Sequence, residues 1–343
     1  MIKNCKNCGG NISFEPKKKA NVCENCGSSF PIEYNYNFNK KPFSENVALK
    51  SDPFAKSIKS LKCESCGANM LLNKFETQKE CPYCGNTSIT ESRKNKLMYI
   101  DSIIPFSFSK VEALKKLKTH INTKFYVKKA VFTKATEKDI QGMYINTFVF
   151  DLLTDTSYSG VLSYTETYKD KDGKTTSKTS YKTVNGNLEK LYNNITIEAN
   201  SHIEQQDLLS IMPYEFDSAV DFKEDFMHGY LLEYEDKMFE ECFKTAERIV
   251  KKYIEKDILN KYHCDNIVRL SANTTYLDNT YNYCLLPIYR VSAIYKDKKY
   301  TALINGQSGK IGKMPINVWR VLLTIFLSCG LVVGIILLVL FLK

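Results

Sequence analysis

Several features that would place this chain in a familiar functional class are missing from its sequence. The N-terminus, MIKNCKNC, lacks the apolar segment that a secretory signal peptide requires. The chain contains no phosphate-loop motif G-x-x-x-x-G-K-[ST], no nucleophile motif G-x-S-x-G and no zinc-protease motif H-E-x-x-H. We therefore expect a protein that is not secreted and that has no recognisable catalytic site.

Histidine is scarce and shows no pattern. The four histidines lie far apart in the chain, and none has a neighbouring pair of acidic residues. We interpret them as surface or structural residues, with metal binding by His263 and the adjacent Cys264 as an alternative. They are His120, His202, His228 and His263.

One glycine-rich segment, NGQSGK (305–310), superficially resembles a phosphate-binding loop. Gly306 and Gly309 are too close together for that motif, and Pro315 falls where its helix should continue. We interpret Asn305-Gly306 as a turn that ends the last strand.

Cysteine, by contrast, is abundant and follows a pattern. The chain has 12 cysteines, and eight of them form two copies of one motif, in which two C-x-x-C pairs are separated by fourteen residues. The second copy begins 58 residues after the first. A glycine follows every pair, where a positive φ would let the chain leave a tight turn. The candidate metal ligands are Cys5, Cys8, Cys23, Cys26, Cys63, Cys66, Cys81 and Cys84.

Two C-x-x-C pairs at about this spacing are typical of a structural Zn²⁺ site, in which four thiolates leave no open position for a substrate. Iron in a rubredoxin-like site would use the same ligands. Thioredoxin-like chemistry would need a C-x-x-C motif within a βαβ unit, and disulfides would need an oxidising compartment. We predict two Zn²⁺ ions, and we expect each ribbon to fold only with its metal because it is too small to fold by apolar burial alone.

The end of the chain is a long apolar run. Residues 321–342 contain no charge and no proline, and as a helix they would span about 33 Å, enough for a hydrocarbon core of about 30 Å. Trp319 precedes the run, as expected at a membrane interface. Positive charges flank mainly its N-terminal side, namely Lys310, Lys313 and Arg320 against Lys343 alone. We predict one transmembrane helix over 317–342 in the cell membrane, with the N-terminal part in the reducing cytosol.

The chain is basic, with a formal net charge of +10. Each Zn²⁺ bound by four thiolates would carry −2, which lowers the total to about +6. A predicted helix over 109–122 opens with a capping box, Ser109 and Glu112, and carries an apolar face of Val111, Leu114, Leu117 and Ile121. We interpret the lysines around it as a solvated face, with contact to phosphates or lipids as the alternative. They are Lys110, Lys115, Lys116, Lys118, Lys124, Lys128 and Lys129.

The middle of the chain, residues 97–312, is predicted to be one α+β domain with a mainly antiparallel sheet. Asp172-Gly173 is a hairpin signal between two strand-like runs. Strands are predicted at 125–133, 143–153, 157–168, 175–184, 281–296 and 300–304, and further helices at 202–211 and 235–259.

These observations give a predicted domain organisation. Two small N-terminal zinc ribbons precede the α+β domain, and one transmembrane helix follows it. Single cysteines outside the ribbons are interpreted as small buried apolar groups, namely Cys242, Cys264, Cys284 and Cys329. The predicted boundaries are 1–30 for ribbon 1, 31–58 for a linker, 59–92 for ribbon 2, 97–312 for the domain and 317–342 for the helix.

Several of these segments occur together in one known family. The second ribbon, IDSIIPFSFSKVEALKKL (100–117), YINTFVFD (144–151), IMPYEFD (211–217), the run 285–315 and the apolar end occur in this order. In this the chain resembles a bacterial family of transcription-factor-IIB-type zinc-ribbon membrane proteins. The resemblance implies no activity, and of the functional residues it carries over only the ribbon cysteines.

Three functions of different classes remain at this point. We expect a non-catalytic, membrane-anchored adaptor or scaffold that binds another protein at the cytosolic face of the bilayer. The alternative is a membrane-tethered nucleic-acid binder that uses lysines and stacking aromatics. An enzyme with an unrecognised site is the third hypothesis. The aromatic candidates for stacking are Phe14, Phe30, Phe75 and Tyr83.

Overall fold

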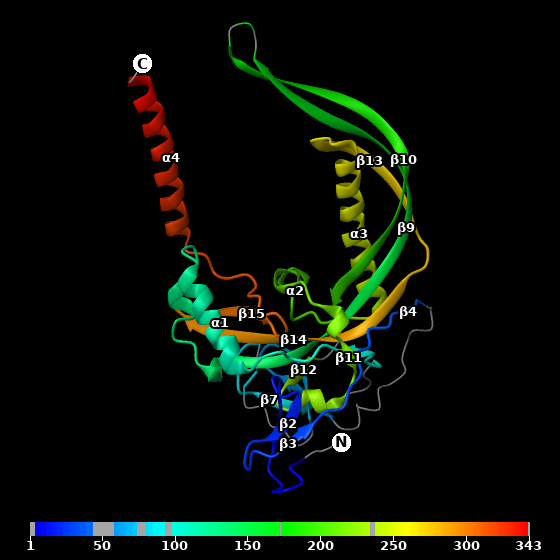
Figure 1. Cartoon of the computed structure of the whole chain (residues 1–343), viewed down its shortest axis with the longest axis vertical. Helices are drawn as coiled ribbons and strands as arrows, with labels where there is room; N and C mark the ends of the chain where they lie inside the picture. Colours follow the sequence, from blue (N-terminus) through cyan, green and yellow to red (C-terminus); the bar gives the residue numbers. More distant parts are fainter. Residues whose placement is uncertain are drawn as a thin grey trace.

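The structure is a computed structural model of the whole chain (Figure 1). It describes residues 4–43, 58–73, 80–81, 83–92, 98–169, 171, 173–233 and 237–341, except for the side chains of 58, 59, 72, 73, 92, 233, 329 and 331–341. Within these ranges the chain forms a three-stranded sheet and a twelve-stranded sheet with helices packed around them. The predicted α+β class, with a large and mainly antiparallel sheet, is confirmed.

Three helices agree with the helical segments predicted at 109–122, 202–211 and 235–259. A fourth helix lies at the C-terminal end of the chain. The capping box at Ser109 and Glu112 is present, with the Ser109 N–H donating to Glu112 Oε2 at 3.2 Å. The helices are α1 (Lys110–Thr123), α2 (Gln205–Ile211), α3 (Phe239–Tyr262) and α4 (Val318–Phe341). Short 3₁₀ turns are η2 (Lys129–Val131), η3 (Glu137–Asp139), η4 (Phe216–Ser218) and η5 (Glu224–Met227).

The small sheet consists of three short strands from the first ribbon. They are β1 (Ile12–Glu15), β2 (Ala20–Cys23) and β3 (Ser29–Pro31). The large sheet contains β4 (Lys41–Pro42), β5 (Ile58–Cys63), β6 (Asn69–Asn73), β7 (Ile89–Ser92), β8 (Ser102–Ile103), β9 (Ile140–Lys169), β10 (Thr175–Glu198), β11 (Val220–Asp221), β12 (Leu231–Glu233), β13 (Asn266–Tyr276), β14 (Thr280–Tyr295) and β15 (Lys298–Asn305).

The large sheet is organised around β9 and β14. These strands pair antiparallel from Thr280↔Asp151 to Val291↔Ile140, and β15 forms the predicted hairpin with β14. The order along the sheet is β11-β8-β14-β9-β12-β6-β5-β7, while β10 and β13 also pair with β9. The strands β5, β6 and β7 of the second ribbon therefore belong to the same sheet as the domain.

The far ends of β9 and β10, together with the whole of β13, extend from the rest of the sheet as a curved arm (Figure 1). We call residues 154–169 of β9, 175–190 of β10 and 266–276 of β13 the β-arm. The antiparallel pairing of β9 with β10 continues to Lys169↔Thr175, and β13 pairs with β9 along the other side. Helix α3 lies along the concave side of the β-arm, and Asp257 accepts hydrogen bonds from Lys190 at 2.8 Å and from the Tyr192 hydroxyl at 2.7 Å.

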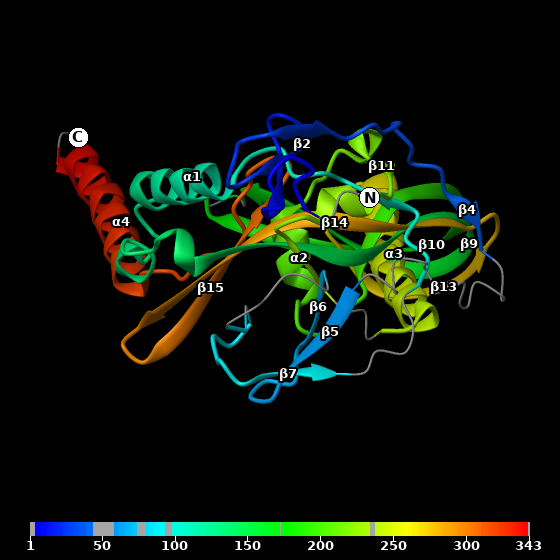
Figure 2. The same ribbon diagram turned by 90° about the horizontal axis from the view of Figure 1, so that it is seen from below.

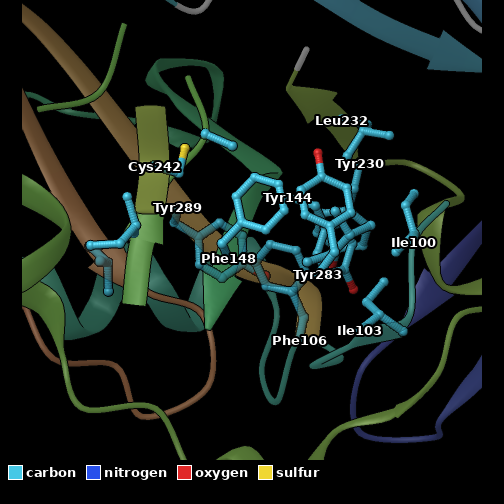
Figure 3. Packing of buried hydrophobic residues seen from close by; sticks show 14 of the residues in the cluster. Ile100, Ile103, Phe106, Tyr144, Phe148, Tyr230, Leu232, Cys242, Tyr283 and Tyr289 are labelled. Carbon is cyan, nitrogen blue, oxygen red and sulfur yellow. The ribbon is translucent and has the colours of Figure 1, made fainter. Parts of the chain in front are cut away.

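The main core lies where the large sheet meets the segments that cross it. Tyr144, Phe148 and Tyr289 are fully buried there, and Phe106 stacks on Tyr230 with ring centroids 4.1 Å apart (Figure 3). The Tyr289 hydroxyl donates to the Phe108 carbonyl at 2.5 Å. Aromatic packing of this kind satisfies the buried hydroxyl while it fills the core.

Two local predictions are wrong. The segment 125–133 is not a strand, because its buried residues at 127, 131 and 132 do not alternate and 129–131 form η2. In α1, Val111 is 55% exposed and Ala113 takes its place on the buried face. At about 100° per residue, Val111 lies roughly 100° from the centre of the face formed by Ala113, Leu114, Leu117 and Ile121.

The described part of the predicted linker 31–58 is packed against the domain. Phe38 stacks on Phe216 with centroids 4.8 Å apart, and Phe43 stacks on Phe239 at 5.0 Å. Strand β4 pairs with β14, and Lys40 forms an ion pair with Asp151 at 2.5 Å. Residues 44–57 lie outside the described residues.

The C-terminal helix begins directly beside α1 (Figures 1 and 2). Asn317 precedes it, and the Asn317 side-chain oxygen accepts from the Arg320 N–H at 3.3 Å. In the part of the chain that the structure describes, no helix combines the length and the apolar character that a membrane crossing needs. The predicted transmembrane span over 317–342 extends beyond the described side chains and stays a prediction.

Candidate metal centres

All four C-x-x-C pairs fold into the same tight turn. In ribbon 1, the Gly9 N–H donates to the Cys5 carbonyl at 2.8 Å, and the Gly27 N–H donates to the Cys23 carbonyl at 3.0 Å. The equivalent bonds in ribbon 2 are 2.9 Å for Gly67 to Cys63 and 2.8 Å for Gly85 to Cys81. The four glycines have φ between 72° and 75°, in the left-handed region that glycine tolerates best, as predicted.

Each ribbon brings its four sulfurs together. In both clusters the four Sγ atoms lie within 4.8 Å of one another. The first cysteine of each pair is buried and the second is more exposed, so every cluster lies at the edge of its ribbon. The eight predicted ligands thus form two separate groups, one of Cys5, Cys8, Cys23 and Cys26 and one of Cys63, Cys66, Cys81 and Cys84.

The spacing of the sulfurs fits a tetrahedral metal ion. Zn–S bonds of about 2.3 Å place tetrahedral sulfurs about 3.8 Å apart, whereas a disulfide would bring them to about 2.05 Å. The shortest sulfur pairs are Cys5–Cys26 at 3.5 Å and Cys8–Cys23 at 3.4 Å in ribbon 1. In ribbon 2, Cys63–Cys84 is 3.4 Å and Cys66–Cys81 is 3.7 Å. Two metal ions, each held by four cysteines, account for this geometry.

Hydrogen bonds favour the thiolate form at some of the cysteines, whereas the pKa of Cys8 and that of Cys81 are raised to about 12. The Ser28 hydroxyl and then the Ser28 N–H lower the pKa of Cys26 to about 6. Burial raises the pKa of Cys84, but the Asn86 N–H and the neighbouring thiols outweigh it and lower this pKa to about 7. Each cluster therefore has at least one sulfur whose surroundings support deprotonation near neutral pH.

Ribbon 1 is joined to the domain through one side of its small sheet. Phe14 is buried against Phe226, with ring centroids 5.2 Å apart, and the Phe14 N–H donates to the His228 carbonyl at 3.0 Å. Asn21 donates to Asp225 at 3.4 Å. The sulfur cluster itself lies away from this junction, because its own small core contains only Cys5, Ile12 and Cys23 with Phe30 against them.

Ribbon 2 is held by cationic side chains of the β14–β15 hairpin. The Arg290 guanidinium lies over the Tyr83 ring, 4.7 Å from its centroid, and Lys299 Nζ donates to the Tyr83 carbonyl at 2.5 Å. Burial, and then the Arg290 charge, lower the pKa of Lys299, whereas Cys84 and Cys81 act in the opposite direction. Arg290 and Lys299 also line a cavity of about 360 Å³ together with Cys81 and Cys84.

Arg290 and Lys299 place two positive charges next to the second cysteine cluster, which the sequence did not indicate. Among the described residues, Arg290 Nε is buried without a hydrogen-bond partner, and Arg290 and Lys299 are close enough to repel each other. A cluster of four thiolates around a divalent ion carries a charge of −2, which two nearby cations would stabilise. The sequence places both residues in or next to a predicted hairpin, but it does not indicate that this hairpin contacts ribbon 2.

Most of the aromatic residues that were predicted to stack on nucleic-acid bases are packed against other parts of the protein. Phe14 and Tyr83 are buried in the contacts described above, and Phe30 is partly buried against the ribbon 1 core. Phe75 lies outside the described residues. Tyr83 also contacts the His202 ring at 5.2 Å between centroids. These rings pack the ribbons against their surroundings.

The remaining histidines and cysteines are dispersed. Among the described residues, the two four-cysteine groups are the only sets of three or more His, Cys, Asp or Glu side chains close enough to share a metal. Cys242 and Cys284 are buried, as predicted, whereas Cys264 is partly exposed. The side chain of Cys329 is outside the described residues. Asn305 closes the predicted turn, since its side chain accepts from the N–H groups of Gln307 and Ser308.

The chain is similar in sequence to a known protein. The chain is 26% identical over 317 residues to the uncharacterised protein YdjG of Bacillus subtilis (strain 168), across 91% of this chain and 89% of that protein. No family model matches the chain. No solved structure matches it either.

Proposed function

We propose that this protein is a non-catalytic scaffold, anchored by its C-terminal helix at the cytosolic face of the cell membrane, which binds a segment of another protein along the β-arm. Two Zn²⁺ ions hold its ribbons in shape. The observation that carries the proposal is the groove between α3 and the edge strand β13, with a volume of about 710 Å³.

The groove combines a free strand edge with mixed side chains. Apart from its pairing with β9, β13 has no strand partner among the described residues. Edge strands with unpaired backbone groups are sites where an extended peptide adds to a sheet. Leu270 and Tyr276 offer apolar contacts, and charged groups of both signs border them along α3, namely Glu241, Lys244, Glu247, Arg248, Lys251 and Glu255.

The ribbons fit a structural role in such a scaffold. Four cysteines around each ion occupy every position of a tetrahedral site, so no position is open for water or substrate. When bound, Zn²⁺ supplies cross-links that short chains cannot obtain from a core of their own. The thiolates require a reducing compartment, which agrees with the proposed cytosolic location.

The membrane attachment is supported by the apolar run that α4 carries. The helix begins after a basic segment and includes Trp319 and Arg320 in its first turn. An aromatic residue and a cation at this position are typical of a membrane interface. We further propose that the chain belongs with the transcription-factor-IIB-type zinc-ribbon membrane proteins that it resembles.

The proposal can be tested by isolating the full chain from native membranes and identifying what remains bound. Ala272 is exposed and lines the groove, so Ala272→Arg should block it and reduce recovery of the partner at least tenfold. Asn273→Arg places the same charge on the opposite face of β13 and serves as the matched control.

Equal recovery of one protein partner with both variants would exclude the groove as the binding site. If wild-type protein instead binds arbitrary nucleic acid with a steep dependence on salt, the nucleic-acid hypothesis replaces the scaffold. Circular dichroism and metal content must remain those of wild type in both variants for the comparison to count.

A further inference from the structure

A basic groove lies beside α1, and α1 is at the end of the molecule opposite the β-arm (Figures 1 and 2). It has a volume of about 790 Å³ and lies between α1 and the turn at Gly309–Ile311. We call it the α1 groove. The lysines and the histidine that line it are Lys115, Lys116, His120, Lys124 and Lys310.

The positive charge of the α1 groove is largely uncompensated. Glu112 is the one acidic residue among its lining residues, and this carboxylate is already paired with Lys17 at 2.6 Å and accepts from the Ser109 N–H. Among the described residues, Lys115, Lys116 and Lys124 have no carboxylate within ion-pair distance. The positive charges of these lysines can therefore interact with an anionic partner.

Exposed apolar side chains form a rim beside these lysines. Phe125 is 55% exposed, Ile316 56% and Trp319 82%, and Tyr126 both lines the groove and contacts Phe125 at 5.6 Å between centroids. Single exposed apolar residues are common on proteins, but a cluster of this kind beside a basic groove indicates a binding surface.

The rim is fixed to the start of α4. The Asn317 N–H donates to the Tyr126 carbonyl at 2.8 Å, and the Lys128 N–H donates to the Pro315 carbonyl at 2.8 Å. Val127 and Ile316 form an isolated β-bridge. The chain therefore enters α4 from the edge of the α1 groove, and the groove has a defined position next to the helix.

We propose that the α1 groove and its apolar rim dock onto the surface of a membrane that contains anionic phospholipids. Lysines are attracted to the negative lipid headgroups, while aromatic and aliphatic side chains enter the interfacial layer. Nucleic acid or an acidic protein would satisfy the lysines, but nucleic acid would leave Ile316 and Phe125 in water. The inference rests on the proposed attachment through α4 and adds a second, lipid-selective contact.

The sequence offers a clean spectroscopic reporter for this contact. Trp319 is the single tryptophan of the chain. In the full chain, Trp319→Phe combined with Phe125→Trp moves the fluorophore from the first turn of α4 to the part of the rim next to Lys124. The protein is reconstituted in vesicles whose lipids carry bromine on their acyl chains, made either of phosphatidylcholine alone or with phosphatidylglycerol.

We expect bromine to quench this reporter several-fold more strongly in the phosphatidylglycerol vesicles, and about 1 M salt to remove the difference because it screens charges beyond about 3 Å. Lys115→Gln, Lys116→Gln and Lys124→Gln together should abolish the dependence on phosphatidylglycerol. Lys178→Gln on β10 with Lys252→Gln and Lys256→Gln on α3 makes the same change in charge far from the α1 groove and should leave quenching unchanged.

Two results would overturn the inference, and they differ from a failure of the membrane attachment itself. Equal quenching in both kinds of vesicle, unaffected by the α1 lysines, would show that α4 alone positions the rim. Release of the reporter by inorganic phosphate or by duplex DNA at matched ionic strength would assign the groove to a soluble anion. If the full chain fails to float with any vesicle, the membrane attachment is wrong.

Discussion

The two ribbons share one sequence pattern but have different surroundings. Ribbon 1 forms its own three-stranded sheet, and its second cysteines, Cys8 and Cys26, are exposed. Ribbon 2 is continuous with the large sheet, because β6 pairs with β12 through Leu71 and Leu232. Cys63 and Cys81 lie in a larger buried cluster with residues of the domain, and Cys84 packs against it. One motif thus serves as an appended module in one place and as part of a sheet in the other.

The difference extends to charge. Arg290 and Lys299 approach ribbon 2, and both contact Tyr83 between two of its cysteines. Among the described residues, no lysine or arginine contacts the turns 5–10 and 23–28 of ribbon 1 through a hydrogen bond, an ion pair or an aromatic ring. We expect the second metal centre to be the more firmly held, because nearby cations stabilise bound thiolates.

Removal of a single ligand should give the largest contrast between the ribbons. Cys5→Ser and Cys63→Ser should each lower the bound metal from two ions to one, with loss of a binding energy of about 10–16 kcal/mol at that site. Cys63→Ser should also lower the unfolding temperature of the domain, since β6 would lose its place beside β12, whereas Cys5→Ser should lower it less because ribbon 1 forms a sheet of its own. Metal analysis and calorimetry measure both effects.

A metal content that stays at two ions in either variant would contradict the assignment of that cluster. If both substitutions shift the domain transition equally, the structural contrast between the ribbons is wrong. Cys264→Ser, which removes a partly exposed sulfur outside both clusters, is the matched control for loss of a thiol.

The cationic neighbours of ribbon 2 should have a smaller, selective effect. Arg290→Gln removes a charge that faces the second cluster, and we expect metal release from that site to a chromogenic chelator to become about 10-fold faster. Release from ribbon 1 should not change. Arg290→Lys should restore part of the effect because it keeps the charge, and Arg248→Gln on α3 is a distant control. Equal acceleration at both sites would exclude charge compensation.

The junction of ribbon 1 should respond to pH with the smallest effect. His228 is only 3% exposed, and burial lowers the pKa of its imidazole below the usual 6.5. The unfolded chain therefore takes up a proton near pH 6.5 that the folded chain resists, so stability falls as pH drops from about 6.5 toward the folded pKa. The maximum slope from one group is about 1.4 kcal/mol per pH unit.

Urea unfolding of His228→Gln at several pH values measures this contribution. The variant should lose part of the decline below about pH 6.5, while His263→Asn, at an exposed helix end with φ of 50°, should keep it. Acid loss of metal affects both variants alike and cancels in the comparison. Parallel stability curves for His228→Gln and wild type would remove His228 as the cause.

Much of the local structure was predictable. The repeated C-x-x-C-G pattern predicted the tight turns and their positive φ values, and Ser109 with Glu112 predicted the start of α1. The hairpin between β9 and β10 followed from Asp172-Gly173, of which Gly173 has φ of 77°. The strand prediction for 125–133 was wrong because the β-branched and aromatic residues of this segment are positioned by contacts with residues distant in sequence. They do not alternate between two faces as in a strand.

The prediction that residues 31–58 form a linker separate from the domain agrees less well with the structure. Residues 31–58 have the composition of a linker, yet their described portion carries Phe38 and Phe43 into the domain. The composition of a segment indicates which of its residues can be solvated. It does not indicate which apolar surface of the domain can cover the few aromatic residues of that segment.

By itself, the sequence determined the features whose partners lie within a few residues along the chain. The turns that gather each set of four sulfurs are closed by hydrogen bonds over four or five residues, so the motif alone specifies them. Tertiary structure decided what each cluster faces. Lys299 reaches Tyr83 across 216 residues, and β14 brings Arg290 to the same ring. Such contacts depend on strand order in the sheet, which a strand's own pattern of side chains does not encode.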